Sequence, residues 1–253
     1  MNIIQFWHEQ EIRFGVLQGE SVHLLEGSPF SSYRVGDYLG PLEEFRILAP
    51  IIPRKIIGIA RNTYSIIKAR GFEIPGEPEF FLKPDSSVIG PGDTIDLPKQ
   101  SQEVICEPEL GIVIGKYARN IPVEYALTYV LGYTCANDVT ARDIMLKDRL
   151  VDRSKSFDTF CPLGPTIYTE ALSVGTRITC YVNQTQVADF PLEEYIFQPA
   201  QLISYLSQMM TLFPGDVILC GSSSDQRKLE VGDQVTIEVE PIGKLCNRVG
   251  AEK

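Results

Sequence analysis

Two glutamates, Glu107 and Glu109, stand one residue apart at the start of an apolar run. The run 110–114 predicts a buried strand, and alternate residues of a strand point to the same face. Both carboxylates can therefore point at one spot, where carboxylate oxygens suit a hard cation such as Mg²⁺ or Ca²⁺. Among the 33 acidic residues of this 253-residue chain, chance gives about four such pairs. A solvated strand face is therefore the alternative interpretation.

Three further charged residues follow, and each has a plain structural alternative. Asp138 comes after a second apolar segment, where an aspartate is typically a turn residue or a helix cap. Arg142 is a candidate for a salt bridge with Asp138 or Asp143. Lys155 would ordinarily be a surface lysine. However, residues 154–165 around it include two Phe, a Cys and two Pro, which is unusually apolar for an exposed loop.

Other catalytic schemes lack the residues that they need. The only histidines, His8 and His23, lie near the N-terminus, which disfavours a Ser-His-Asp or Cys-His arrangement. The six cysteines are dispersed without a C-x-x-C pair. We therefore expect reduced, mostly buried thiols and neither a zinc site nor a disulfide framework. The sequence has no glycine-rich phosphate-binding motif, so nucleotide cofactors are unsupported.

The elements that must position these side chains are mainly strands. Segments 14–17 and 21–25 predict an N-terminal hairpin, and segments 110–114 and 217–220 predict buried strands. Helices are predicted over 123–131 and, with a clearer apolar stripe, over 199–210. Prolines around residues 49–53 favour extended backbone and indicate a boundary. We predict a small N-terminal β domain over residues 1–50 and a main domain over 51–253, in an α+β fold that is mainly β.

Composition and charge narrow the class of partners. Hydrophobic residues make up 44% of the chain and charged residues 22%, ordinary values for a soluble globular protein. The formal net charge of −10 favours neither nucleic acid nor an anionic membrane surface as a partner. Since no apolar stretch reaches membrane length and no signal-peptide pattern is visible, we expect a cytoplasmic protein.

Several motifs, in this order along the chain, resemble the fumarylacetoacetate hydrolase family. They are Phe80–Pro84, Ser87–Asp93, Glu107–Gly115, Gly132–Asp143, Lys155–Pro165 and Met210–Gly221. Each motif is common by itself, but the ordered set is highly specific. The resemblance extends from about Ile57 to Val249, which is most of the chain.

The resemblance implies a β-roll with a small N-terminal β unit, usually assembled as a homodimer. It implies that Glu107, Glu109 and Asp138 hold Mg²⁺, with Mn²⁺ or Ca²⁺ as alternatives because all accept carboxylate oxygens. It further implies a small 2-oxo acid or β-dicarbonyl substrate whose two oxygens chelate the metal, in reactions that share an enolate. Arg142 and Lys155 would supply positive charge at the developing oxyanion.

The sequence departs from the family pattern where family hydrolases carry an acid–base dyad. Those hydrolases usually have Asn-Tyr-x-x-His-x-x-Glu before a glycine, and Asn62 and Gly71 keep that spacing here. Ile66 stands in place of the His and Ala69 in place of the Glu, and neither can accept a proton from water. We expect residues 62–71 to form a short helix or lid beside the metal, on which Ile66 and Ala69 present an apolar wall.

Other departures concern substrate contact. Met145 stands where a Gln is common, and Cys220-Gly221-Ser222-Ser223 replaces the usual Thr-Gly-Thr-Pro. The segment 222–229 is also shorter than the corresponding loop of the family. The side chains expected to contact the substrate are Asn62, Tyr64, Ile66, Met145 and Ser222.

A metal site without the water-activating dyad leaves three functional hypotheses. The first is a metal-dependent enzyme that uses enolate chemistry without activated water, as a tautomerase or isomerase, a decarboxylase or a cyclase. The second is a C–C hydrolase of acylpyruvate type whose base comes from elsewhere, with Tyr64, Lys68 or another acidic residue as candidates. The third is a non-catalytic family member that binds a metal or a ligand.

Overall fold

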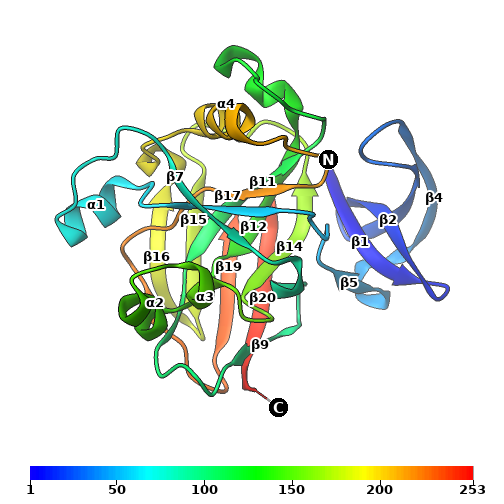
Figure 1. Cartoon of the computed structure of the whole chain (residues 1–253). Helices are drawn as coiled ribbons and strands as arrows, with labels where there is room; N and C mark the ends of the chain where they lie inside the picture. The colour runs from blue at the N-terminus through cyan, green and yellow to red at the C-terminus, as the bar shows by residue number, and fades with distance from the viewer. Residues whose placement is uncertain (253) are drawn as a thin grey trace.

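In the computed structural model, which describes residues 1–252, one long sheet runs through the molecule (Figure 1). Its strand order is β4-β3-β2-β1-β14-β12-β11-β17-β6-β7, with β5 pairing with β1 and β8 with β14. The strands are β1 (Asn2–His8), β2 (Glu11–Gln18), β3 (Ser21–Gly27), β4 (Tyr33–Pro41), β5 (Arg46–Leu48), β6 (Ile56–Ala60), β7 (Glu79–Lys83), β8 (Val88–Ile89), β11 (Pro108–Ile114), β12 (Val130–Asn137), β14 (Cys161–Tyr168) and β17 (Val217–Leu219).

Two smaller sheets complete the β structure. One has the order β16-β15-β19-β20-β9 and the other the order β13-β10-β18. Their strands are β9 (Thr94–Leu97), β10 (Val104–Cys106), β13 (Thr140–Ala141), β15 (Arg177–Val182), β16 (Thr185–Pro191), β18 (Arg227–Lys228), β19 (Gln234–Val239) and β20 (Gly243–Ala251). The predicted α+β fold that is mainly β is confirmed.

The main core lies between the long sheet and the β16-to-β9 sheet. Ile112 of β11, Ile178 of β15 and Ile237 of β19 belong to one buried cluster. All residues of β11 are buried because β12 and β17 flank it and both of its faces are covered. This strand is therefore a rigid support for the glutamates at its start.

Helices are few and short. The α-helices are α1 (Tyr64–Arg70), α2 (Arg142–Asp148), α3 (Asp152–Lys155) and α4 (Pro199–Met209), and the 3₁₀ turns are η1 (Leu42–Glu44), η2 (Asp85–Ser87), η3 (Val123–Tyr129) and η4 (Leu192–Glu194). The helix predicted over 199–210 is α4, which buries Leu202, Ile203 and Leu206. The helix predicted over 123–131 is instead the 3₁₀ turn η3, because Val130 already pairs with Ile114 in the sheet.

The N-terminal strands extend the long sheet rather than standing apart. The predicted hairpin is confirmed as β2 and β3, and β1 pairs with β14 through Asn2 and Tyr168. A small core of Ile4, Phe6 and Val22 fills this part, which is blue in Figure 1. The predicted division after residue 50 falls between β5 and β6.

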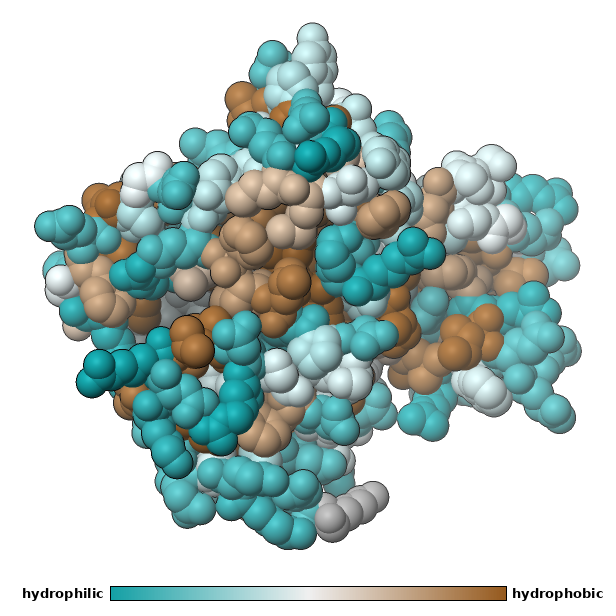
Figure 2. All heavy atoms as spheres, in the orientation of Figure 1, coloured by the Kyte–Doolittle hydropathy of each residue, from teal (hydrophilic) through white to brown (hydrophobic). Residues whose placement is uncertain are grey.

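Two surface properties follow from this arrangement. None of the helices described here is long and apolar enough to cross a membrane. The strand β7 lies at the end of the long sheet and exposes Phe80 and Leu82. Figure 2 shows apolar side chains near the middle of the face that it draws, the region that β7 crosses in Figure 1. In the interior, five of the six cysteines are buried and all six are free thiols, as predicted.

Candidate active site

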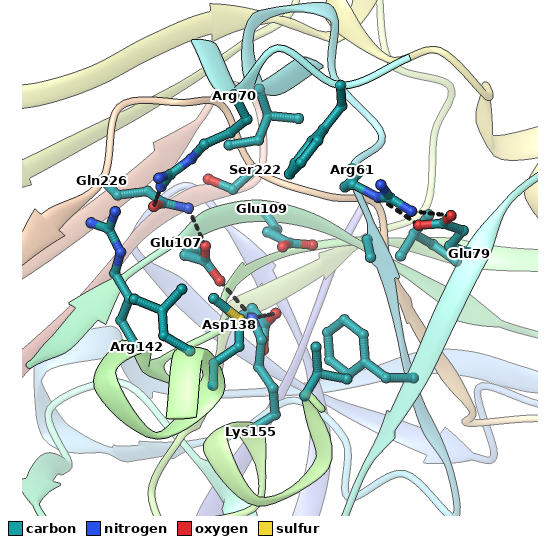
Figure 3. A pocket seen from close by; sticks show the side chains of 18 residues that line it. Arg61, Arg70, Glu79, Glu107, Glu109, Asp138, Arg142, Lys155, Ser222 and Gln226 are labelled. Atoms are coloured by element: carbon teal, nitrogen blue, oxygen red, sulfur yellow. Dashed lines mark hydrogen bonds and ion pairs between the residues drawn. The ribbon is translucent and has the colours of Figure 1, made fainter. Parts of the chain in front are cut away.

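A pocket of about 410 Å³ opens beside the start of β11 (Figure 3). It gathers eight of the predicted site residues, namely Ile66, Glu107, Glu109, Asp138, Arg142, Met145, Lys155 and Ser222. These residues come from segments between 66 and 222 in the sequence, so the fold brings together what the sequence separates. Asn62 and Tyr64 do not line the pocket.

Three carboxylates meet in this pocket because of the way two strands pair. Strands β11 and β12 run antiparallel, with Pro108 opposite Asn137. The first residues of β11 therefore meet the end of β12, where the backbone N–H of Asp138 donates to the carbonyl of Glu107 at 2.9 Å. Glu109, two residues further along, is 3% exposed, and Asp138 is 1% exposed. Pairing register thus places Glu107, Glu109 and Asp138 at one site.

Two lysines compensate this negative charge. The Nζ of Lys155, at the end of α3, donates to Oε2 of Glu107 at 2.5 Å and also to Oδ2 of Asp138. The Nζ of Lys83, from β7, donates to Oδ1 of Asp138 at 2.6 Å. Both lysines are buried. Lys155 therefore points into the carboxylate cluster. The alternative interpretation, a surface lysine that points into solvent, is wrong.

The electrostatics of the three carboxylates differ. Burial raises the pKa of the Glu109 carboxyl well above its ordinary value, and the nearby charge of Asp138 adds to this shift. Burial acts in the same direction on Asp138, but the charges of Lys155 and Lys83 outweigh it and lower the pKa of Asp138. Burial would lower the pKa of Lys155, but Asp138 and Glu107 raise it above its ordinary value. The lysine is therefore an ammonium donor here and not a base.

The chemistry of this donor set fits a hard divalent cation. Oxygens of three carboxylates face one pocket. Among the described residues no lysine is hydrogen-bonded to Glu109, whose Oε2 accepts from the backbone N–H of Gly221 at 2.6 Å. Within residues 1–252 no group of three Asp, Glu, His or Cys side chains is placed so that it could hold a metal ion without rearrangement. Instead, the Lys155 ammonium lies between Glu107 and Asp138. A cation would bind by sharing these carboxylates with the ammonium.

Arginines occupy the walls of the pocket above the carboxylates (Figure 3). Arg61 is paired with Glu79, its Nε lying 2.6 Å from Oε2. Arg142 Nη1 lies 3.4 Å from Oε1 of Glu103, so neither Asp138 nor Asp143 is its partner. The alternative ion pairs proposed for Arg142 are therefore wrong, and its guanidinium remains within the pocket.

Comparison with known proteins identifies the family. The model for the C-terminal domain of fumarylacetoacetate (FAA) hydrolase matches residues 55–250, and the model described as Rv2993c-like, N-terminal, matches residues 1–50. The chain belongs to the fumarylacetoacetate hydrolase family. This membership and the β-roll fold with its small N-terminal unit confirm what the sequence motifs predicted.

Similar proteins of this family come from all three domains of life. A protein of Archaeoglobus fulgidus is 42% identical over 222 residues, covering 86% of this chain and 85% of its own. The human oxaloacetate tautomerase FAHD2B, mitochondrial, is 39% identical over 224 residues, covering 83% of this chain and 71% of its own. The crystal structure of 5-carboxymethyl-2-hydroxymuconate delta-isomerase from Mycobacterium smegmatis is 34% identical, with a TM-score of 0.92 and complete coverage of both chains.

The segment in which family hydrolases carry their dyad forms the short helix α1. The side chain of Thr63 caps its N-terminus, and Gly71 ends it in the left-handed conformation with φ of 66°. Ile66 lines the pocket, but Ala69 is exposed and does not. The prediction that Ile66 and Ala69 together line the pocket as an apolar wall is therefore wrong for Ala69. Arg70, one turn after Ile66, lines the pocket instead.

Asn62 and Tyr64 lie outside the pocket, Asn62 as a buried residue and Tyr64 as an exposed one, and their expected contact with substrate stays a prediction. The Asn62 amide donates to the carbonyls of Phe197 and Cys220 at 3.0 and 2.8 Å, and its oxygen accepts from the N–H of Phe197 at 2.8 Å. Tyr64 is 49% exposed outside the pocket. Asn62 therefore fixes the start of α1 to two distant segments.

Replacing Asn62 with Ala should destabilise the fold by about 2–4 kcal/mol, because three hydrogen bonds at a buried amide are lost together. Urea unfolding followed by circular dichroism measures this free energy. Tyr64→Ala, in the same segment but at an exposed position, is the control and should cost less than about 1 kcal/mol. Equal stability of Asn62→Ala and the unmodified protein would contradict the structural role of this amide.

Ser222 and Met145 lie where substrate contact was expected. The Ser222 hydroxyl is buried in the pocket wall without a hydrogen-bond partner among the described residues. A buried hydroxyl of this kind is a ready contact for a polar ligand atom. Met145, from α2, contributes to the apolar lining.

Sequence reasoning missed Lys83, Arg70 and Gln226 as members of the site. The position of Lys83 could have been predicted, because it lies two residues after the buried Phe81 along β7 and therefore points to the same face of the strand. Gln226 donates to Glu107 Oε1 across 119 positions of sequence. No local pattern predicts such a contact.

Proposed function

We propose that this chain is a divalent-metal-dependent enzyme that interconverts tautomers or double-bond isomers of a 2-oxo acid or β-dicarbonyl acid through an enolate. The observation that carries this proposal is a pocket in which two buried carboxylates, the partly buried Glu107 and the cationic Lys155 meet, while Ile66 stands where family hydrolases place a base. Two similar proteins, the human oxaloacetate tautomerase and the mycobacterial isomerase, support this class of reaction by their names.

In this proposal Glu107, Glu109 and Asp138 hold Mg²⁺, or alternatively Mn²⁺ or Ca²⁺. When bound, the cation supplies Lewis-acid polarisation of a substrate carbonyl. Lys155 holds a positive charge beside these carboxylates, and Arg142 adds a second one at the pocket wall. Both would stabilise negative charge on the substrate oxygen in the enolate. The unpaired Ser222 hydroxyl orients a substrate oxygen.

In this proposal the apolar side chains that line the pocket decide between isomerisation and hydrolysis. Ile66, Phe72 and Leu146 line the pocket together with the charged groups. Apolar side chains restrict water and strengthen electrostatic interactions within the pocket. An attacking water would have no acid–base partner at position 66, so chemistry that needs no water is favoured. Decarboxylation and cyclisation also need no attacking water and are alternatives within this proposal.

A product-resolved assay tests the proposed function. Protein loaded with Mg²⁺ is mixed with the enol form of oxaloacetate, the enol is followed by its ultraviolet absorbance, and products are identified by NMR. We expect accelerated enol-to-keto conversion that disappears with a chelator. Pyruvate as the main product would assign a decarboxylase instead. No acceleration with oxaloacetate or an acylpyruvate under any of the three cations would assign a non-catalytic binding protein.

The homodimer and the cytoplasmic location inferred from the sequence stay predictions. Light scattering on the purified protein measures the assembly directly. A monomeric mass across micromolar concentrations would contradict the dimer.

A further inference from the structure

The pocket contains four cationic side chains, and one of them has no acidic partner. The other three cationic side chains form ion pairs with carboxylates. These pairs are Arg61 with Glu79, Arg142 with Glu103, and Lys155 with both Glu107 and Asp138. In the part of the chain that the structure describes, Arg70 forms no ion pair; its Nη2 donates to the neutral amide oxygen of Gln226 at 3.1 Å. Arg70 therefore retains its charge for a ligand.

The position of Arg70 relates this free charge to the carboxylate cluster. Arg70 is the last residue of α1, one turn beyond Ile66, and both side chains line the pocket. Gln226 spans the gap, because its oxygen accepts from Arg70 while its Nε2 donates to Oε1 of Glu107. Figure 3 places Arg70 and Arg142 on the same side of Glu107. The guanidinium therefore lies about one carboxamide group from the carboxylates.

We propose that Arg70 is a specificity-determining residue that selects substrates with a second carboxylate, making the preferred substrate a short 2-oxo dicarboxylate. This inference rests on the proposed function, which places the 2-oxo acid end of the substrate at Glu107, Glu109 and Asp138. A chain of two or so carbons then brings the far end of the molecule to Arg70. A far carboxylate replaces the Gln226 oxygen on the guanidinium, while Gln226 keeps its bond to Glu107.

The physical gain comes from exchanging a neutral acceptor for a charged one. Hydrogen bonds from a guanidinium to a carboxylate are shorter and about twice as strong as neutral ones, and they are often bidentate. The overall charge of −10 repels anions at long range. Local positive charge at Arg70 is therefore needed to hold a second anionic group.

Calorimetric binding of two matched acids to the Mg²⁺-loaded protein tests this inference. The acids 2-oxoglutarate and 2-oxopentanoate have the same chain length, and they differ only in a terminal carboxylate against a methyl group. We expect the unmodified protein to bind 2-oxoglutarate at least about tenfold more tightly. Arg70→Gln should bring this ratio close to one and leave 2-oxopentanoate affinity unchanged, while Arg70→Lys should keep part of the preference.

Lys68→Gln is the matched control, because Lys68 lies in the same helical turn but is exposed and outside the pocket. It should keep the ratio of the unmodified protein. A ratio near one in the unmodified protein, a ratio that survives Arg70→Gln, or equal weakening of both acids would overturn the inference. Because binding is the readout, a protein that fails to tautomerise oxaloacetate but shows the Arg70-dependent ratio would refute the proposed reaction and not the selectivity.

Discussion

Replacing Glu109 with Gln is expected to weaken divalent-cation binding at least about 100-fold and to remove any metal-dependent turnover. Glu109 is the most isolated of the three carboxylates, since among residues 1–252 no lysine bonds to it and its one hydrogen bond comes from Gly221. Burial and the charge of Asp138 raise the pKa of Glu109, and a bound cation would favour its carboxylate form. A neutral amide keeps the shape and the Gly221 bond but offers no charge.

Calorimetric titration with Mg²⁺ and Mn²⁺, together with thermal unfolding, separates this loss from misfolding. Without metal, the melting temperature of Glu109→Gln should not fall, because one of three crowded negative charges is removed. The rise in melting temperature that Mg²⁺ produces through linkage should disappear. Glu79→Gln, on the same pocket but paired with Arg61, should still bind the cation. Cation affinity within threefold of the unmodified protein in Glu109→Gln would remove this residue from the ligand set.

Strand alternation predicted that Glu107 and Glu109 share a face, and the resemblance to the family added Asp138 to them. Glu107 and Glu109 alternate into a buried run, and Asp138 ends the next strand of the same sheet, so antiparallel pairing brings the three together. Period-two patterning and ordered family motifs carry this information without knowledge of distant contacts. The site position of Lys155 was implied by the resemblance to the family, and its unusually apolar flanks, which are typical of a buried segment, agree with it.

The orientation of α1 was not predictable in the same way. Spacing of three residues places Ile66 and Ala69 near each other on a helix, but it does not state which residues face the pocket. Packing of the helix start through Asn62, which binds the backbone at Phe197 and Cys220, fixes that rotation. These contacts span 135 and 158 positions, and local sequence patterns do not record them.

Hydrolysis of acetylpyruvate by the unmodified protein should be at least about 100-fold slower than by a family hydrolase with the dyad, because positioned acid–base catalysis contributes about 10²–10⁴ in rate. Chromatographic detection of acetate and pyruvate measures it. Strong hydrolysis that survives Tyr64→Phe and Lys68→Gln would show that the base lies elsewhere. In that case Ile66 would not mark the loss of hydrolytic function.

Restoring the dyad should follow the helix geometry and not the family spacing. Ile66→His introduces an imidazole that faces the pocket, and alone it should raise acetylpyruvate hydrolysis modestly. Adding Ala69→Glu should bring little more, because Ala69 is exposed outside the pocket. Adding Arg70→Glu instead places a carboxylate one turn from the imidazole on the pocket face, where it can orient the ring and support its protonated form. We expect Ile66→His with Arg70→Glu to exceed Ile66→His with Ala69→Glu by about tenfold in hydrolysis. The reverse order would mean that α1 rotates when substrate binds, so that Ala69 and not Arg70 faces the reacting atoms.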